Sequence, residues 1–321
     1  MTRWNLQRRP LSRKAKSAYK IQAAPPLILS LSFLAVIIMG TLLLLLPGMT
    51  TQPITFADSL FTATSAVTVT GLVVVDTGTA FTTLGLTVIA LLIQIGGLGL
   101  MTFAVVTLIA LGGKISFLQQ SAIKEAFNQT DLSTLASTAR SVLIFAFIIE
   151  TIGFTILALF WLQTKPPAEA LFHAFFYTIS AFNNAGFALS ADSLSFYVGN
   201  PVVNLTITGL FIVGGLGFSV WIDLIKKRTW QKLSVYSKLM ISSTIIVNAI
   251  ALLLIYSIEK DNPNTLATLD TASQWWASWF QAVTPRTAGF NTVDISALEN
   301  ATTWLTLLLM FIGGGSSFNK R

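Results

Sequence analysis

The chain has 321 residues and a formal net charge of +7, and it is 53% hydrophobic but only 10% charged. Soluble globular proteins carry roughly 25% charged residues, so this composition excludes an ordinary water-soluble fold. The chain contains no cysteine, which excludes disulfides and thiolate metal sites. We therefore expect an integral membrane protein.

The first segment, residues 1–26, holds seven Lys and Arg residues and precedes a long apolar run. We expect a basic cytoplasmic terminus that lies against anionic lipid. The apolar run is too long for a signal peptide, and residues 46–49 lack the small-x-small cleavage pattern. An uncleaved membrane anchor is therefore predicted.

Six apolar segments follow along the chain, each long enough to cross a hydrocarbon core that takes about 20 helical residues. They cover residues 27–57, 77–113, 141–162, 201–222, 239–258 and 300–319. Only the third carries a charge, Glu150. An acid inside a span is functional by default, but a structural partner such as a Ser, a Thr or Arg140 explains Glu150 equally well.

The positive charges are confined to one side of the predicted topology. If the N-terminus is cytoplasmic and the spans alternate, 17 of the 20 Lys and Arg residues are cytoplasmic. The positive-inside rule therefore favours this orientation, and it argues against a nucleic-acid role for the net charge. The external side holds most of the acids, which are Asp58, Asp76, Glu169, Asp192, Glu259, Asp261, Asp270, Asp294 and Glu299.

A shorter apolar segment that ends at a glycine lies between each odd-numbered span and the next. The three segments are residues 59–71, 174–186 and 273–289. Aligned on that glycine, an aromatic residue stands ten positions earlier and a glycine cluster follows 24 to 28 positions later. The aligned residues are Phe61, Phe176 and Trp279, then Leu72, Phe187 and Phe290, then Gly96-Gly97, Gly214-Gly215 and Gly313-Gly314-Gly315. The repeat predicts three parallel units of span, half-helix, glycine turn and span.

This repeat divides the chain into units and loops. We expect a first unit at 27–113, a cytoplasmic loop at 114–140, a second unit at 141–225, a loop at 226–238 and an incomplete third unit at 239–321. Non-helical backbone at membrane depth is tolerated only where it is buried in protein or lines a water-filled path. Three such turns in register indicate a shared central path.

The turns suit a path for monovalent cations. Rings of backbone carbonyls replace a cation's hydration shell, and glycine supplies the positive φ that turns several carbonyls toward one axis. Gly71, Gly186 and Gly289 fit that need, and the absence of acids at the turns argues against divalent selectivity. Alternatively, a re-entrant glycine only permits a tight turn; a lone segment would favour that interpretation, but three in register favour the path.

The residues of these turns carry a family resemblance. Residues 68–71 (TVTG), 183–187 (NNAGF) and 284–291 (TPRTAGFN) resemble the first three filter sequences of the Trk/Ktr/HKT potassium transporter superfamily. Residues 93–99 (IQIGGLG) and the long uncharged spans are most similar to KtrB, the membrane subunit of bacterial Ktr systems. The likeness covers residues 20–315.

This resemblance implies an all-α integral membrane fold of parallel membrane-pore-membrane repeats around a pseudo-fourfold axis, with three of the expected four repeats present. It also implies potassium uptake across a bacterial plasma membrane, often with sodium dependence, by a homodimer that docks on a cytosolic ring of nucleotide-binding regulatory subunits. A glycine-rich gate is implied at 313–317, at Gly313, Gly314 and Gly315. The implied K+ selectivity filter consists of Val69, Thr70, Gly71, Asn184, Ala185, Gly186, Thr287, Ala288 and Gly289.

A fourfold filter needs four strands, and residues 318–321 do not resemble the family's continuation. The sequence thus predicts a C-terminally truncated product whose conduction alone is doubtful. One alternative is a truncated, non-conducting subunit that acts by assembling with a partner. A sodium-coupled solute transporter is another, although it usually has inverted repeats rather than parallel ones. An enzyme is not expected, because the spans show no Ser-His pair, paired Asp or metal cluster, and no cofactor is expected beyond the transported K+ and Na+.

Several single residues carry separate expectations. Arg286 is expected to hold the outer backbone of the filter by hydrogen bonds, with a gating role as the alternative. His173, the only histidine, is expected to pack rather than to bind metal. The Gly-Gly-Leu-Gly runs at 96–99 and 214–217 are expected to allow close packing inside membrane helices. The polar loops 114–140 and 223–238 are either plain connectors or docking sites for the regulatory subunits.

Overall fold

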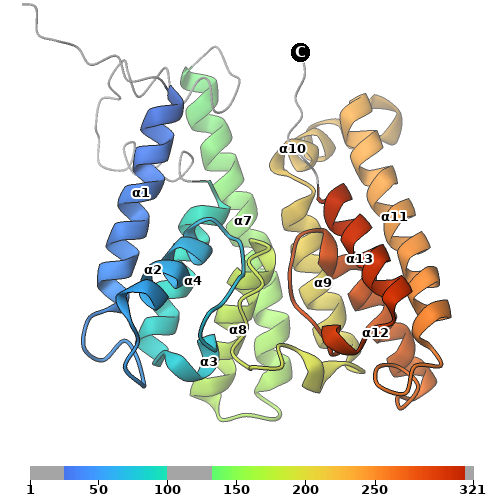
Figure 1. The fold of residues 1–321 in the computed structure, drawn as a ribbon. Coiled ribbons are helices and arrows are strands. Elements are labelled where there is room, and N and C mark those ends of the chain that lie inside the picture. The colour runs from blue at the N-terminus through green and yellow to red at the C-terminus, as the bar shows by residue number, and fades with distance from the viewer. Residues whose placement is uncertain (1–24, 100–131, 315–321) are drawn as a thin grey trace, which may run out of the picture.

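The computed structural model describes residues 25–99 and 132–314. Over these residues the chain is helical and has no strand, apart from one isolated bridge between Thr50 and Phe81. The described part is therefore all-α, as predicted. Figure 1 shows long helices that run between its upper and lower edges, with short helices and loops between them.

The helices repeat in the order long helix, half-helix, returning helix. The long helices are α1 (Pro25–Leu44), α7 (Leu132–Trp161) and α11 (Val235–Glu259). The half-helices are α2 (Phe56–Val67), α8 (Pro167–Phe182) and α12 (Thr271–Val283). The returning helices are α4 (Thr83–Gly97), α9 (Pro201–Gly215) and α13 (Asn300–Ile312). The connecting elements are α3 (Thr77–Ala80), α10 (Phe218–Lys227), η1 (Ser195–Tyr197), η2 (Trp230–Lys232), η3 (Thr284–Arg286) and η4 (Ile295–Ala297).

Side-chain caps start two of the half-helices. Thr55 and Asp58 form a capping box at α2, in which each side chain accepts from the other's backbone N–H. Asp270 caps α12 by accepting from the N–H groups of Ala272 and Ser273. Such caps satisfy donors that a helix start would otherwise leave unpaired.

Two of the described helices, α7 from Arg140 and α11, are long and apolar enough to cross a membrane, or three if the bent pair α9 and α10 counts as one. The prediction of a continuous span over 201–222 is wrong, because the chain bends by 90° between α9 and α10. Gly217, with φ +84°, lies at this bend. A left-handed residue cannot continue a right-handed helix, so the second glycine run ends a helix instead of lying inside one.

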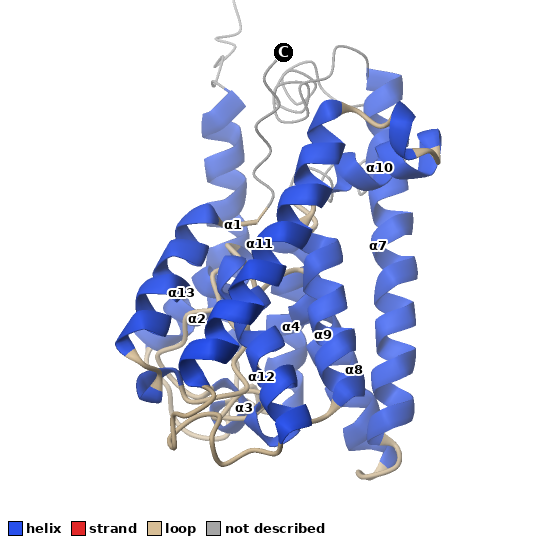
Figure 2. Ribbon diagram, turned by 90° about the vertical axis from the view of Figure 1, so that its right-hand side faces the viewer, coloured by secondary structure: helices blue, strands red, loops and turns tan. Residues whose placement is uncertain are grey.

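Packing follows the repeat. Each long helix packs on the half-helix that follows it, as α1 on α2, α7 on α8 and α11 on α12. Contacts between units repeat as well, since α4 packs on α8 and α9 packs on α12. Figure 2 shows the same bundle from the side, with the half-helices among the longer ones. Each half-helix therefore packs on its own long helix and on at least one returning helix, α4 for α2 and α9 for α8 and α12.

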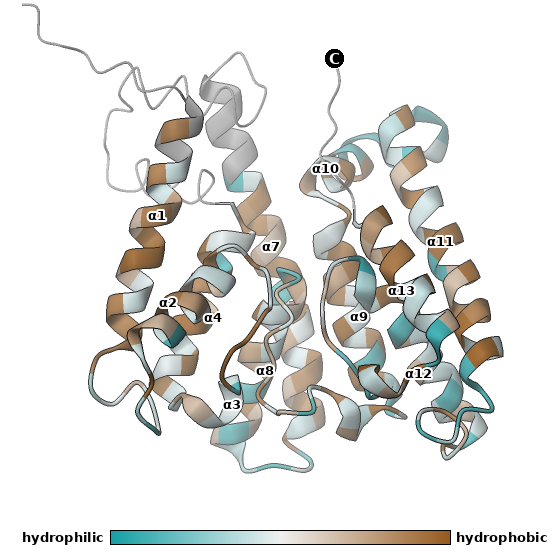
Figure 3. Cartoon of the chain, viewed as in Figure 1, coloured by the Kyte–Doolittle hydropathy of each residue, from teal (hydrophilic) through white to brown (hydrophobic). Residues whose placement is uncertain are grey.

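The outer surface of the bundle is apolar. Leu31 on α1, Phe147 on α7 and Ile245 on α11 are all at least half exposed. Figure 3 shows hydrophobic residues along these helices and on α13, and hydrophilic ones gathered in loops at the lower edge. An apolar surface of this extent is that of a protein whose solvent is lipid.

Candidate ion pathway at three glycine turns

The chain makes a tight turn after each half-helix, and the structure brings the three turns together. We call residues 68–71 the first glycine turn, 183–186 the second and 286–289 the third. A Cβ built on Gly71 would lie 2.3 Å from the carbonyl oxygen of Ala185, and one on Gly186 would lie 2.5 Å from that of Ala288. The second turn therefore lies between the other two, in backbone contact with both.

The turns share an unusual backbone. Gly71, Gly186 and Gly289 have φ values of +78°, +72° and +75°. In the first two turns the residue two positions earlier is also left-handed, Val69 at +55° and Asn184 at +58°. The third turn differs, because Thr287 has an extended φ of −155°. An ordinary strand points successive carbonyls to opposite sides, whereas left-handed residues at alternate positions turn them toward the same side.

Each turn is closed by hydrogen bonds to its own half-helix. The N–H of Thr70 donates to the carbonyl of Ser65 at 2.8 Å, and that of Ala185 donates to the carbonyl of Ser180 at 2.7 Å. In the third turn the N–H of Ala288 donates to the Thr284 carbonyl at 2.9 Å. These bonds hold each turn at the C-terminal, negative end of a helix dipole.

The residue after each turn is held unequally. The hydroxyl of Ser180 donates to the Phe187 carbonyl and that of Thr284 donates to the Phe290 carbonyl, both at 2.7 Å. In the first turn the corresponding Ser65 hydroxyl, among the described residues, has no partner although it is buried. The backbone after the first turn is therefore fixed by fewer bonds than the other two.

Glycines of the returning helices seat the half-helix ends. A Cβ on Gly96 would lie 2.0 Å from the carbonyl oxygen of Val67, the last residue of α2. A Cβ on Gly214 would lie 1.8 Å from that of Phe182, the last residue of α8. The expectation that these glycines allow close packing is therefore confirmed.

The second and third turns are joined by a side chain. The Asn184 carboxamide, oriented to satisfy both of its ends, donates to Thr287 Oγ1 and to the Phe211 carbonyl, each at 2.9 Å. Its oxygen accepts from the N–H of Gly215 at 3.2 Å. Asn184 thus ties the second turn to the third turn and to the glycine run of α9.

Arg286 holds a different partner from the one expected. Its Nε donates to the carbonyl of Gly313 and its Nη1 to Asn248 Oδ1, each at 3.0 Å. The expectation that Arg286 holds the outer backbone of the turn is wrong. Its long side chain starts in the turn but bonds the end of α13 and a residue of α11 instead. Gly313, with φ +66°, ends α13, and Gly314 contacts Thr287. Gly315 lies outside the described residues.

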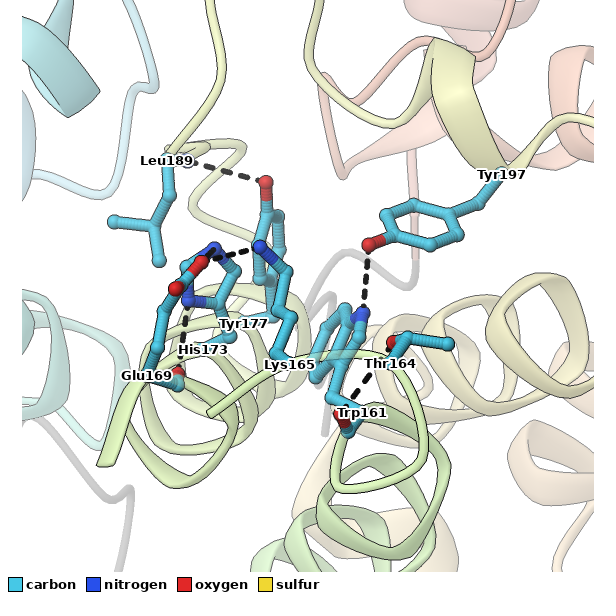
Figure 4. Close-up of polar contacts among 8 residues, drawn as sticks. All are labelled: Trp161, Thr164, Lys165, Glu169, His173, Tyr177, Leu189 and Tyr197. Atoms are coloured by element: carbon cyan, nitrogen blue, oxygen red, sulfur yellow. Dashed lines mark hydrogen bonds and ion pairs between the residues drawn. The ribbon is translucent and has the colours of Figure 1, made fainter. Parts of the chain in front are cut away.

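Aromatic and polar contacts support the lower end of the second unit (Figure 4). Trp161 Nε1 donates to the Tyr197 hydroxyl at 2.9 Å, and the Leu189 N–H donates to the Tyr177 hydroxyl at 3.2 Å. The ring of His173 packs against Trp161, with centroids 5.7 Å apart. His173 thus packs as expected, and the cluster anchors the segment that follows the second turn.

Glu150 has a partner that the sequence did not suggest. Gln94 Nε2 donates to Glu150 Oε1 at 2.7 Å and to Oε2 at 3.0 Å. Asn183 Nδ2 in turn donates to Gln94 Oε1 at 2.7 Å. The expected Ser, Thr or Arg140 is not the partner shown. One signal was available in the sequence: Gln94 is the one amide side chain in the uncharged segment 77–113.

Comparison with known proteins defines the class of this molecule. The family model of TrkH, described as a cation transport protein, matches residues 4–318. The chain belongs to this family of membrane transport proteins, which are not enzymes.

Individual relatives agree with that assignment. The chain is 48% identical over 297 residues to the Ktr system potassium uptake protein B of Bacillus subtilis, covering 92% of this chain and 67% of that protein. It is 41% identical over 302 residues to the protein of the same name from Vibrio alginolyticus, covering 93% and 66%. The crystal structure of the potassium transporter TrkH from Vibrio parahaemolyticus matches with a TM-score of 0.69 at 18% identity, covering 94% of this chain and 58% of that one. The chain thus spans about two thirds of the length of these two sequence relatives.

Proposed function

We propose that the chain is a membrane subunit for potassium uptake and that its three glycine turns form the K+ selectivity filter. The observation that carries the proposal is the backbone contact of the second turn at Gly186 with the turns of Gly71 and Gly289, each glycine left-handed and each following a half-helix. The relatives named potassium uptake protein B support potassium as the cargo.

The geometry suits a dehydrated monovalent cation. Carbonyl oxygens replace its water, and the helix ends add partial negative charge without a fixed carboxylate. The proposed ligands are the carbonyls of Val69, Thr70, Gly71, Asn184, Ala185, Gly186, Thr287, Ala288 and Gly289. The proposed gate is Gly313 with Gly314 and Gly315, of which Gly313 is bonded to Arg286.

We further propose that these units occupy three positions of a pseudo-fourfold ring. The contact of α4 with α8 is repeated by that of α9 with α12, as successive rotations about one axis would require. The residue after the first turn is more open than its counterparts: Leu72 is 61% exposed, whereas the aligned Phe187 and Phe290 are 0% and 1% exposed. A fourth unit packed between α13 and the first turn would close the ring.

The proposed setting is a bacterial plasma membrane with a cytoplasmic N-terminus. The junction of α10 and α11 carries Lys226, Lys227, Arg228 and Lys232, which the positive-inside rule assigns to the cytoplasm. The proposed assembly is a homodimer on a cytosolic ring of nucleotide-binding subunits, with sodium-dependent uptake. Both relatives are named as protein B of a Ktr system, which supports a subunit that works with partners.

The test is rubidium-86 uptake into cells that lack their own potassium transporters. We would compare the chain as given, its Gly71→Asp variant and a version extended by a fourth unit. We expect uptake by the chain as given or by the extended version, and we expect Gly71→Asp to abolish it, because the new carboxylate would enter the line of carbonyls. Uptake that persists unchanged in every Gly71→Asp variant would refute the filter assignment.

The exposed residues after the first turn favour one second candidate function, a non-conducting subunit that acts by assembling with a partner. Leu72, Val73 and Val74 are all more than half exposed beside the first turn. Coexpression with an intact relative separates the two functions. A chain that lowers the relative's uptake and transports nothing alone or when extended would be an assembly subunit.

A further inference from the structure

A chain of three polar side chains runs from a transmembrane helix to the second glycine turn. Glu150 on α7 accepts two hydrogen bonds from Gln94 on α4, and Gln94 accepts one from Asn183 at the end of α8. Asn183 also donates to the Ile179 carbonyl at 2.9 Å. These three hydrogen-bonded side chains thus join three helices from two units at the level where the turn begins.

Glu150 sets the donor-to-acceptor direction of these hydrogen bonds. Both Glu150 oxygens accept from the Gln94 NH₂ group, and an amide has one end that donates and one that accepts. Glu150 therefore fixes the Gln94 amide with its NH₂ toward α7, which leaves the Gln94 oxygen facing Asn183. Asn183 then presents its NH₂ to Gln94, so the Glu150 side chain orients both amides.

Asn183 is well placed to pass that orientation to the turn. It is the C-cap of α8, is 8% exposed, and immediately precedes Asn184, whose φ is +58°. Gly97 leaves room for it, since a Cβ there would lie 2.1 Å from Asn183 Oδ1. The residues aligned with Asn183 in the first and third turns are Thr68 and Arg286, so only the second turn carries an amide here.

We propose that Glu150 is a positioning residue that, through Gln94 and Asn183, holds the second glycine turn in the shape that prefers K+ over Na+. This inference rests on the proposed filter function and adds a determinant of its ion preference. Glu150 itself touches no ion in this scheme. The second turn lies between the other two, so a change in its shape alters its contacts with both neighbours.

The experiment measures ion-dependent thermal stabilisation of the purified full chain in detergent. Unfolding midpoints titrated with KCl or NaCl, at ionic strength held constant with choline chloride, give the ratio of apparent K+ to Na+ affinities. Glu150→Gln is nearly isosteric and removes the fixed direction, so we expect the ratio to fall about tenfold, the size of one hydrogen bond. Glu299→Gln, at an exposed glutamate that makes no side-chain cap bond, is the matched control.

The swapped variant Gln94→Glu with Glu150→Gln tests direction rather than packing. A carboxylate at position 94 still accepts from Asn183 and also from the new amide at 150, so we expect a ratio within about twofold of the parent. An unchanged ratio in Glu150→Gln, or a swap as impaired as that single variant, would overturn the inference. A parent chain without any K+ preference would overturn the proposed filter, and with it this inference, whereas the two preceding outcomes leave the filter standing.

Discussion

Gly71 combines two constraints that can be separated by substitution. Its φ of +78° disfavours any side chain, and a Cβ would also meet the Ala185 carbonyl at 2.3 Å. Gly48 has a similar φ of +89° but nothing within 4 Å of a Cβ. The pair therefore distinguishes backbone strain from contact between turns.

We expect Gly48→Ala to lower the free energy of unfolding by about 1 kcal/mol, the cost of a left-handed alanine. Gly71→Ala should cost about 1–3 kcal/mol more because it overpacks the second turn, and it should also abolish K+-specific stabilisation. Thermal unfolding with and without KCl measures both. Equal losses in the two variants would contradict contact between the turns.

We expect Arg286 to restrain the C-terminal end of α13. Its guanidinium bonds Gly313 and Asn248 through different nitrogens, a fork that a single ammonium cannot reproduce. We expect Arg286→Lys to release the Gly313 carbonyl and to speed amide hydrogen exchange at residues 309–314 by about tenfold. Lys260→Gln, at an exposed residue on another loop, should leave exchange there unchanged. Slow exchange in Arg286→Lys would exclude Arg286 as a restraint on this segment.

At the scale of single residues, the sequence predicted the glycines of the turns better than the hydrogen bonds around them. The glycine spacing placed all three left-handed positions, because only glycine takes positive φ without a penalty. It did not predict that Val69 and Asn184 are also left-handed, since a β-branched valine disfavours positive φ and an asparagine only tolerates it. The partners of Arg286 and Glu150 were missed because they lie on helices distant in sequence.

Among the elements, α9 carries an internal control for the seating of a half-helix. A Cβ on Gly214 would meet the Phe182 carbonyl at 1.8 Å, whereas one on Gly209 meets nothing within 4 Å. Gly214→Ala should therefore destabilise the protein by about 1–3 kcal/mol. Gly209→Ala should stabilise it by up to about 1 kcal/mol, the gain in helix propensity. Unfolding midpoints that fall equally for both would show that close packing at Gly214 is unimportant.

The contact between α10 and α11 should weaken in acid. Lys227 and the Ser234 N–H hold the pKa of Asp223 well below its usual range, so this contact contributes stability above the ordinary carboxylate pKa of about 4 and loses it as the pH falls further. Asp223→Asn should lower the unfolding midpoint at pH 7 but show a smaller further drop between pH 4 and pH 3. Asp261→Asn, at an 87% exposed side chain, is the control. Identical acid profiles for parent and Asp223→Asn would refute this role.

Helix positions were largely predictable, and helix breaks were not. Charge-free runs located the helices because lipid excludes charged side chains. The 90° bend after α9 was missed because hydropathy is blind to backbone conformation, and Gly217 in an apolar run is equally compatible with a continuing helix.

For the whole molecule, exposure around the three turns is unequal. Leu72 is open where Phe187 and Phe290 are buried, and Trp304 and Phe311 of α13 are 73% and 92% exposed. Hydrophobic periodicity alone could not reveal this difference, because it depends on which neighbour covers each unit.

The cysteine-free sequence makes this asymmetry measurable. Leu72→Cys should react with a maleimide probe at least tenfold faster than Phe290→Cys, because reaction requires an accessible thiol. In a chain extended by a fourth unit, labelling at position 72 should slow to the rate at 290. Fast labelling at 72 in both chains would show that no fourth unit packs beside the first turn.

The three turns lie on one polypeptide, and they are not identical: Thr287 has a negative φ where Val69 and Asn184 are left-handed. In a pore built from identical subunits, every substitution is copied to all sides at once. Here a substitution alters one wall alone, so a bound ion would rest among unlike ligands, off the geometric centre. If the turns form the proposed filter, its ion preference can be adjusted in single, small steps, each contributed by one wall.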